Sequence, residues 1–260
     1  MFRNLKNDDA GKPMFHSYDE IFNKRGNAYH DAMRLAPLAR KKEFEIALSG
    51  AEIVDGDVLC DLPSGGGYLA DHLPRDLKLR YIAIDPAEVF ARKMQVGRSE
   101  WHLAPLDKIP VKNDAADVLV SIAGLHHVED RVSVFREMRR ILRIGGRLSI
   151  LEIPKGAITD DFLNDFVDRH NSMGHDGNFV DDQFRADLCE AGFTIIKDEL
   201  RKYSWDFTDE QSMIEFIRLM FWLDKASRDE IREGVEKYLG VTSDQTGCRF
   251  NWELQSIVAV

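Results

Sequence analysis

The 260-residue chain is predicted to fold as an α/β protein with a doubly wound, mainly parallel sheet and a helical cap. From Asp57 onward, short β-rich runs alternate with helical stretches, a pattern typical of parallel strands joined by crossover helices. The first run passes into three glycines, Gly65 to Gly67, and then into a new apolar helical face that begins at Tyr68. This is the layout of a nucleotide-binding turn at the edge of such a sheet.

Composition narrows the class of partner. A formal net charge of -10 and a pI near 5.3 argue against nucleic acid, because binding its backbone needs clustered lysine and arginine. Cys60, Cys189 and Cys248 form no Cys-x-x-Cys pair and have no histidine at metal spacing, so we expect no disulfide and no metal. No apolar leader and no run of ~20 apolar residues is present, so we expect a cytoplasmic protein without membrane contact.

The N-terminal segment is expected to be helical. Residues 1–13 read as a flexible lead-in, and residues 14–48 as two or three helical pieces interrupted at Gly26 and Pro37. Tyr18 and Tyr29 stand ahead of the main sheet. Two interpretations stay open: these tyrosines cap the sheet edge, or they close over a bound ligand. Residues 1–50 are therefore predicted to be a helical cap segment, and residues 51–260 the main domain.

The main domain contains five predicted strands with helical crossovers, at residues 57–61, 81–85, 101–103, 117–124 and 147–153. Pro86 is expected to open a helix over residues 87–96, as proline does in a first helical turn. A second, amphipathic helix is predicted over residues 131–142, followed by a turn at Gly145 and Gly146.

Past Pro154 the pattern predicts helical insertions near residues 154–180 and 208–240. Between them lie a helix over residues 181–193 and a sixth strand over 194–207, and the chain closes with a strand over 251–260. The second insertion is a helical pair between the last two strands, where it is expected to stand above the sheet as a lid. Its aromatic and methionine side chains either belong to the core or wall an apolar ligand; they are Phe216, Met220, Phe221 and Trp222.

Polar side chains close several predicted strands. Asp61, Asp85 and Ser121 all lie at the carboxyl ends, where open α/β sheets bind their ligands. Glycines let the backbone take positive φ and come close to a ligand. Asp85 has two compatible roles, a helix N-cap ahead of Pro86 and an acceptor for ligand hydroxyls.

These motifs together resemble the class I S-adenosylmethionine-dependent methyltransferases, including the ubiquinone and menaquinone type, over roughly residues 58–193. The matching stretches are the acid and glycine turn at 61–67, the acid at Asp85, PLDKIP at 105–110, DVLVSIAGLHHVED at 117–130 and LRIGGRLSILEI at 142–153. The resemblance implies a Rossmann-like sheet of about seven strands, mostly parallel with an antiparallel last strand. It also implies S-adenosylmethionine as cofactor and S-adenosylhomocysteine as product. A dinucleotide dehydrogenase is disfavoured because its third spaced glycine is missing.

The resemblance also implies a set of cofactor-binding residues. Asp85 would hold the ribose, Asp61 and the backbone of 64–67 the amino-acid tail, and Leu106 with Asp107 the adenine. Two positions depart from the family pattern, because Pro63 replaces a glycine of the turn and Pro105 stands where an acid is usual. The full predicted set is Tyr18, Tyr29, Asp61, Pro63, Ser64, Gly65, Gly67, Asp85, Pro86, Leu106, Asp107, Ser121 and Ile122.

For catalysis, alignment of the acceptor behind the sulfonium methyl supplies much of the rate. A base is needed only if the acceptor is a hydroxyl or a protonated amine. His126 and His175 are the predicted catalytic residues, with His127 and the tyrosines as further candidates. A structural role for His126 at the start of the next helix stays open.

We therefore expect a methyltransferase acting on a small molecule, without nucleic-acid or membrane partners, and leave a homodimer open. One alternative is methylation of a carrier-bound acyl group or a protein. Another is a non-catalytic protein that binds S-adenosylmethionine, which the departures at Pro63 and Pro105 suggest.

Overall fold

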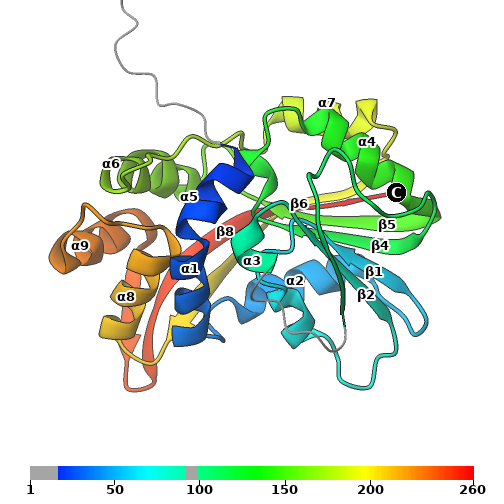
Figure 1. The fold of residues 1–260 in the computed structure, drawn as a ribbon. Coiled ribbons are helices and arrows are strands. Elements are labelled where there is room, and N and C mark those ends of the chain that lie inside the picture. The colour runs from blue at the N-terminus through cyan, green and yellow to red at the C-terminus, as the bar shows by residue number, and fades with distance from the viewer. Residues whose placement is uncertain (1–16, 92–98) are drawn as a thin grey trace, which may run out of the picture.

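A mixed eight-stranded sheet runs through the molecule (Figure 1). The computed structural model describes residues 17–91 and 99–260. The strand order is β3-β2-β1-β4-β5-β8-β6, and β7 pairs with β8. The strands are β1 (Val58–Asp61), β2 (Arg80–Asp85), β3 (Ser99–Leu103), β4 (Ala116–Ile122), β5 (Leu142–Glu152), β6 (Ile195–Phe207), β7 (Val241–Asp244) and β8 (Gly247–Ala259).

The first five strands are parallel, because β1 pairs with β2 and β4, β2 with β3, and β4 with β5. Strands β2 and β3 lie on one side of β1, and β4 and β5 lie on the other. The direction in which strands are added therefore reverses between β1 and β4. Ligands in such sheets bind at the carboxyl ends beside this switch point. Asp61, Asp85 and Glu152 end β1, β2 and β5 along that edge.

The last strands are antiparallel, which confirms the predicted fold class. β8 lies between β5 and β6, but β5 reaches only Gln255 of β8, while β6 pairs with it as far as Cys248. The unshared halves of β6 and β8 extend past the parallel strands toward α8 (Glu210–Met220) and α9 (Arg228–Leu239) (Figure 1). β7 was not predicted, because its Val-Thr-Ser-Asp run is polar and mostly exposed.

Two cores cover the two faces of the sheet, as the alternation of side chains along strands requires. On one face, α4 (Arg131–Ile141) and α7 (Asp182–Glu190) bury Phe135 and Phe184. On the other face, α2 (Lys41–Ala51) buries Phe44 and Ala47 in a core that continues through the buried side chains of α8 and α9.

The N-terminal prediction was wrong at Gly26. The helix α1 (Tyr18–Leu35) runs through this residue without a break. The glycine is needed for packing rather than for a turn, because a Cβ there would lie 3.1 Å from Val89 and 3.4 Å from Phe90. The predicted interruption at Pro37 is confirmed, since α1 ends at Leu35 and α2 begins at Lys41.

Helical segments occupy both predicted insertions. The insertion near 154–180 contains three consecutive short helical segments, followed by a loop over 171–181. The insertion near 208–240 contains α8 and α9. The elements of the first are α5 (Ile158–Asp161), the π-helical turn η3 (Phe162–Val167) and α6 (Asp168–His170).

Other boundaries differ from expectation. The predicted helix at Tyr68 is only a short 3-10 turn, η1 (Tyr68–His72). The helix after Pro86 is described as α3 (Glu88–Ala91), and its predicted remainder at 92–96, like the lead-in at 1–13, lies outside the described residues. β5 begins before the glycine pair, where its register with β4 shifts. No helix of the described chain has the length and apolar character needed to cross a membrane.

Candidate active site

The glycine turn after β1 has the backbone geometry that its sequence predicts. Gly65 and Gly67 adopt φ values of 54° and 75°, a region that favours glycine. A Cβ on Gly65 would meet nothing within 4 Å, so the backbone is open to a ligand on that side. The proline in the turn is therefore followed by glycines that carry the unusual conformation.

Pro63 is accommodated by a second glycine, on another strand end. A Cβ at Gly124 would lie 2.4 Å from Pro63 Cγ and 3.3 Å from the Tyr18 ring. The proline ring thus packs directly against the bare backbone that follows β4. The contact between Pro63 and Gly124 explains how the backbone of the turn accommodates a proline at the position of the usual first glycine.

Asp85 is fully buried and already holds three donors. Its Oδ1 accepts from the Ala87 backbone N–H at 2.8 Å, just ahead of α3, which begins at Glu88. Its Oδ2 accepts from the Gly65 N–H at 2.7 Å and from the Tyr18 hydroxyl at 3.0 Å. Burial raises the pKa of this carboxyl to about 7, although these hydrogen bonds oppose the shift.

Asp61 lies beside it at the end of β1 and accepts a hydrogen bond from the Tyr81 hydroxyl. Burial raises its pKa to about 7 as well; the Tyr81 bond opposes that shift and the charge of Asp85 adds to it. Two neighbouring acids with raised pKa values are suited to a ligand that brings a cation, because its charge would favour their ionised forms.

A pocket opens over this turn. Seven of the predicted cofactor residues line it: Tyr18, Tyr29, Asp61, Pro63, Ser64, Gly65 and Ile122. The hydroxyls of Ser64 and Ser121 are buried without a hydrogen-bond partner in the described structure, so this region has unused polar groups for a polar cofactor.

The remaining predicted residues do not line this pocket; they are Gly67, Asp85, Pro86, Leu106, Asp107 and Ser121. Asp85 and Ser121 are buried close behind it, whereas Leu106 is buried in the core of the opposite sheet face. Asp107 is exposed. The structure therefore brings the tail and ribose candidates together and leaves the adenine candidates apart.

Comparison with solved structures supports the fold. The [4+2]-cyclase SpnF matches with a TM-score of 0.63 and 14% identity, covering 94% of this chain and 96% of that one. A family model described as a methyltransferase domain matches residues 60–150. The arsenite methyltransferase of Halobacterium salinarum is 24% identical over 180 residues, 64% of this chain and 46% of that protein. The ubiquinone/menaquinone biosynthesis C-methyltransferase UbiE of Xylella fastidiosa is 24% identical over 166 residues, 58% of this chain and 64% of that protein.

The chain therefore carries a methyltransferase-type domain over residues 60–150 and resembles class I S-adenosylmethionine-dependent methyltransferases. The matches span about half to two thirds of the length of these curated relatives. The matched residues run from within β1 to within β5 and include the glycine turn, Asp61 and Asp85.

A second pocket adjoins the first. Both are lined by Phe22, Tyr29, Arg40 and Ala123. The second is walled mainly by aromatic and aliphatic side chains, with imidazoles on one side; beyond the shared residues its lining is Arg25, Glu43, His126, His127, Ile153, Leu163, His175, Trp205, Met220, Phe221 and Trp252. We call it the acceptor pocket.

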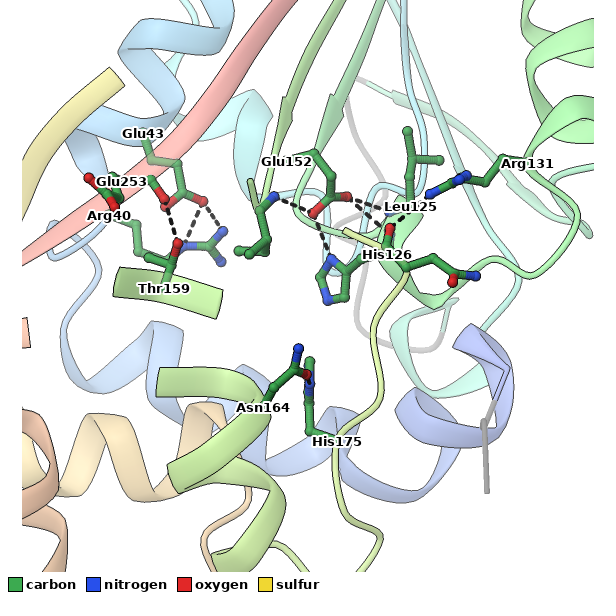
Figure 2. Close-up of polar contacts among 12 residues, drawn as sticks. Arg40, Glu43, Leu125, His126, Arg131, Glu152, Thr159, Asn164, His175 and Glu253 are labelled. Atoms are coloured by element: carbon green, nitrogen blue, oxygen red, sulfur yellow. Dashed lines mark hydrogen bonds and ion pairs between the residues drawn. The ribbon is translucent and has the colours of Figure 1, made fainter. Parts of the chain in front are cut away.

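The predicted catalytic histidines meet in the acceptor pocket. His126 lies on the 3-10 turn η2 (Leu125–His127), and its Nδ1 is 2.6 Å from Glu152 Oε1. Figure 2 shows Glu152 beside His126, with His175 facing them from the loop below. The other oxygen of Glu152 accepts from the backbone of Leu125 and His126, so the carboxylate fixes both the turn and the ring.

The aromatic set of the second insertion divides between the two roles left open for it. Met220 and Phe221 line the acceptor pocket, whereas Phe216 is fully buried in the core. Trp222 is partly buried and lines neither pocket.

Several residues that line the acceptor pocket or support its histidines were not found by sequence reasoning. Glu152 carried a usable signal, since it closes a strand as Asp61 and Asp85 do. Arg25, Arg40, Trp205 and Trp252 carried none, because they come from helices and strands far apart in the chain and meet only through the fold.

Proposed function

We propose that the chain transfers the methyl group of S-adenosylmethionine to a small organic acceptor by direct displacement. The observation that carries the proposal is the contact between the two pockets, whose common wall includes Phe22, Tyr29 and Arg40. A cofactor over the glycine turn and an acceptor among the aromatic side chains would then meet at that wall. In the reaction the S–CH3 bond breaks with its electron pair left on sulfur, and a lone pair of the acceptor forms the new bond.

The cofactor site is proposed with the predicted roles. Asp61 pairs with the ammonium of the amino-acid tail, Ser64 to Gly67 pass beneath it, and Asp85 accepts from the ribose. Because Tyr18 already donates to Asp85, its hydroxyl must move aside or share that oxygen when the ribose binds. Ser121, Ile122 and Pro86 are kept in the proposed cofactor-binding set. Leu106 and Asp107 are kept as the proposed adenine contacts.

His126 is the proposed base for an acceptor that must lose a proton. An ionised carboxylate only accepts, so Glu152 holds the hydrogen on Nδ1 and leaves the Nε2 lone pair free. His175 faces the same space and is proposed to position the acceptor.

The lining favours an acceptor with negative charge. Arg25 Nε is buried without a hydrogen-bond partner in the described structure, and its guanidinium lies 4.8 Å from the Phe22 ring centroid. Burial lowers the Arg25 pKa to about 10, which still leaves the group charged at neutral pH. No cysteine lines either pocket, so thiolate ligands for a soft ion such as arsenite are absent from this lining and an organic acceptor is favoured.

Two alternatives are kept. A carrier-bound acyl group or a protein as acceptor is disfavoured by the net charge of -10 if the carrier is also acidic. A cofactor-binding protein without methyl transfer remains, because the likeness to SpnF shows that this fold also occurs in a protein named as a cyclase. The cytoplasmic location and the homodimer stay predictions.

The test begins with calorimetry of the purified chain against S-adenosylmethionine and S-adenosylhomocysteine. We expect micromolar binding of both, and no binding at high micromolar concentration would refute the enzyme assignment. Transfer of a labelled methyl group to a panel of phenols, quinol precursors and their neutral ethers then tests the acceptor class. Binding without transfer to any compound would favour the non-catalytic alternative.

A further inference from the structure

Three buried histidines converge at the acceptor end of the active site. His126, His127 and His175 each offer one ring nitrogen, and these nitrogens all lie within 4.8 Å of one another. His126 and His127 belong to η2, and His175 to the loop after α6. Backbone bonds hold the loop in place, since Asn178 N–H donates to the His126 carbonyl at 2.8 Å and His175 N–H to Asp168 at 2.8 Å.

Two of the three rings are oriented by oxygen partners behind them. His126 Nδ1 lies 2.6 Å from Glu152, and His175 Nδ1 lies 3.2 Å from Asn164 Oδ1 (Figure 2). Both partners accept, so each Nδ1 carries the hydrogen and each Nε2 keeps its lone pair. Histidines that bind metals usually donate their second ring N–H to a carboxylate or carbonyl oxygen in this way.

The third ring has one buried nitrogen without a partner among the described residues. His127 Nδ1 is buried and has no hydrogen-bond partner in the described structure. Leaving such an atom unsatisfied costs free energy, so a buried nitrogen next to two other imidazoles points to a missing partner.

We propose that His126, His127 and His175 bind a divalent first-row transition metal ion such as Zn²⁺, with the fourth coordination position open to the acceptor pocket. Nitrogens around a tetrahedral Zn²⁺ lie about 3.4 Å apart, because each Zn–N bond is about 2.1 Å. The rings therefore need to approach one another by no more than roughly 1.4 Å from their present spacing.

The surrounding charges fit this ion and suggest its fourth ligand. Glu152 is fully buried and has no lysine or arginine partner among the described residues, so a cation on His126 would balance its charge. Arg25 lines the same pocket and would oppose a bare cation, which favours an anionic fourth ligand.

Metal binding itself does not depend on the proposed methyl transfer, but its role in catalysis does. With the ion bound, Nε2 of His126 is a ligand and no longer a base. An acceptor hydroxyl in the fourth position would then lose its proton to water more readily, because coordination lowers its pKa.

The experiment uses the full chain after chelation and dialysis, titrated with Co²⁺ and Zn²⁺ alone. We expect about one ion per chain, with the intense visible absorption of four-coordinate Co²⁺ and displacement by Zn²⁺. The variants His127→Asn and His175→Asn should weaken Zn²⁺ binding at least tenfold, and Glu152→Gln about tenfold or more. His102→Asn is the matched control, since His102 bonds to Glu100 on the surface and should leave binding unchanged.

Binding of S-adenosylhomocysteine checks that each variant is folded. Failure of the parent chain to bind Co²⁺ at micromolar concentration would overturn the site, as would equal Zn²⁺ affinity in His127→Asn and the parent. Metal binding without methyl transfer would leave the site standing and count against the proposed function. Methyl transfer by a chain that binds no metal would support the proposed function and overturn the metal site.

Discussion

The cofactor pocket and the acceptor pocket share a wall but are built in different ways. The first has the turn after β1 as its polar part, with Asp61, Ser64 and Gly65 in one short stretch and Asp85 bonded to Gly65 behind it. The second collects His126, Trp205 and Phe221 from separate parts of the chain. Local sequence therefore supplies the polar groups of the first pocket, whereas the lining of the second depends on how distant elements pack.

The largest expected effect is a loss of affinity for S-adenosylhomocysteine when Asp85 is removed. Asp85→Ala removes a buried carboxylate that we propose as the ribose acceptor, and two charge-assisted bonds of about 1.5 kcal/mol each correspond to roughly 100-fold weaker binding. Calorimetry with S-adenosylhomocysteine measures this. Asp182→Ala, at an exposed acid, is the control. Retained affinity in Asp85→Ala would remove Asp85 from the site.

A pH titration tests the same acids without mutation. Asp61 and Asp85 have pKa values of about 7 in the folded chain against an ordinary value of 3.8, and we expect binding to require their ionised forms. Affinity for S-adenosylhomocysteine should fall at least tenfold from pH 8 to pH 6.

Stability should respond in the opposite sense in the ligand-free chain. Its folded state holds these protons more tightly than the unfolded state, so their contribution is full below about pH 4 and is lost as the pH rises through about 7. An affinity that does not change with pH would contradict the binding expectation. A melting temperature of the ligand-free chain that does not fall over the same pH range would contradict the stability expectation.

A change in the acceptor wall should separate the two pockets. Phe221→Ala removes an aromatic surface from the acceptor pocket only. With any acceptor that the panel identifies, we expect KM to rise by about tenfold, as loss of part of a buried aromatic contact implies. The dissociation constant of S-adenosylhomocysteine should stay within about twofold. An equal rise in the KM of the acceptor and in the dissociation constant of S-adenosylhomocysteine would show that the two pockets do not act separately.

The smallest expected effect concerns the donor to Asp85. Tyr18→Phe keeps the ring against Phe22 and removes only the hydroxyl that competes with the ribose. We expect S-adenosylhomocysteine to bind about threefold more tightly, in line with one hydrogen bond released. Weaker binding in the same calorimetric titration would mean instead that Tyr18 closes over the cofactor.

The contrast between local signals and long-range contacts also explains which features could be predicted from the sequence. Strand ends with acids, a glycine run and alternating elements identified the sheet and the cofactor turn, because these signals are local. Gly26 was misread as a break, since its reason, the approach of Val89 and Phe90, lies on another element. The fit of Pro63 to Gly124 and the buried Arg25 were equally invisible, because each depends on a contact between separated segments.

Arg40 gives the shared wall a thermodynamic consequence. Its guanidinium donates to the Tyr29 hydroxyl on one side and to Glu43 on the other, and Glu43 in turn accepts from Trp205 at 3.1 Å. A ligand in one pocket that displaced Arg40 would therefore act, through Glu43, on Trp205 in the other. By linkage, any factor by which the donor alters affinity for the acceptor must equal the factor by which the acceptor alters affinity for the donor.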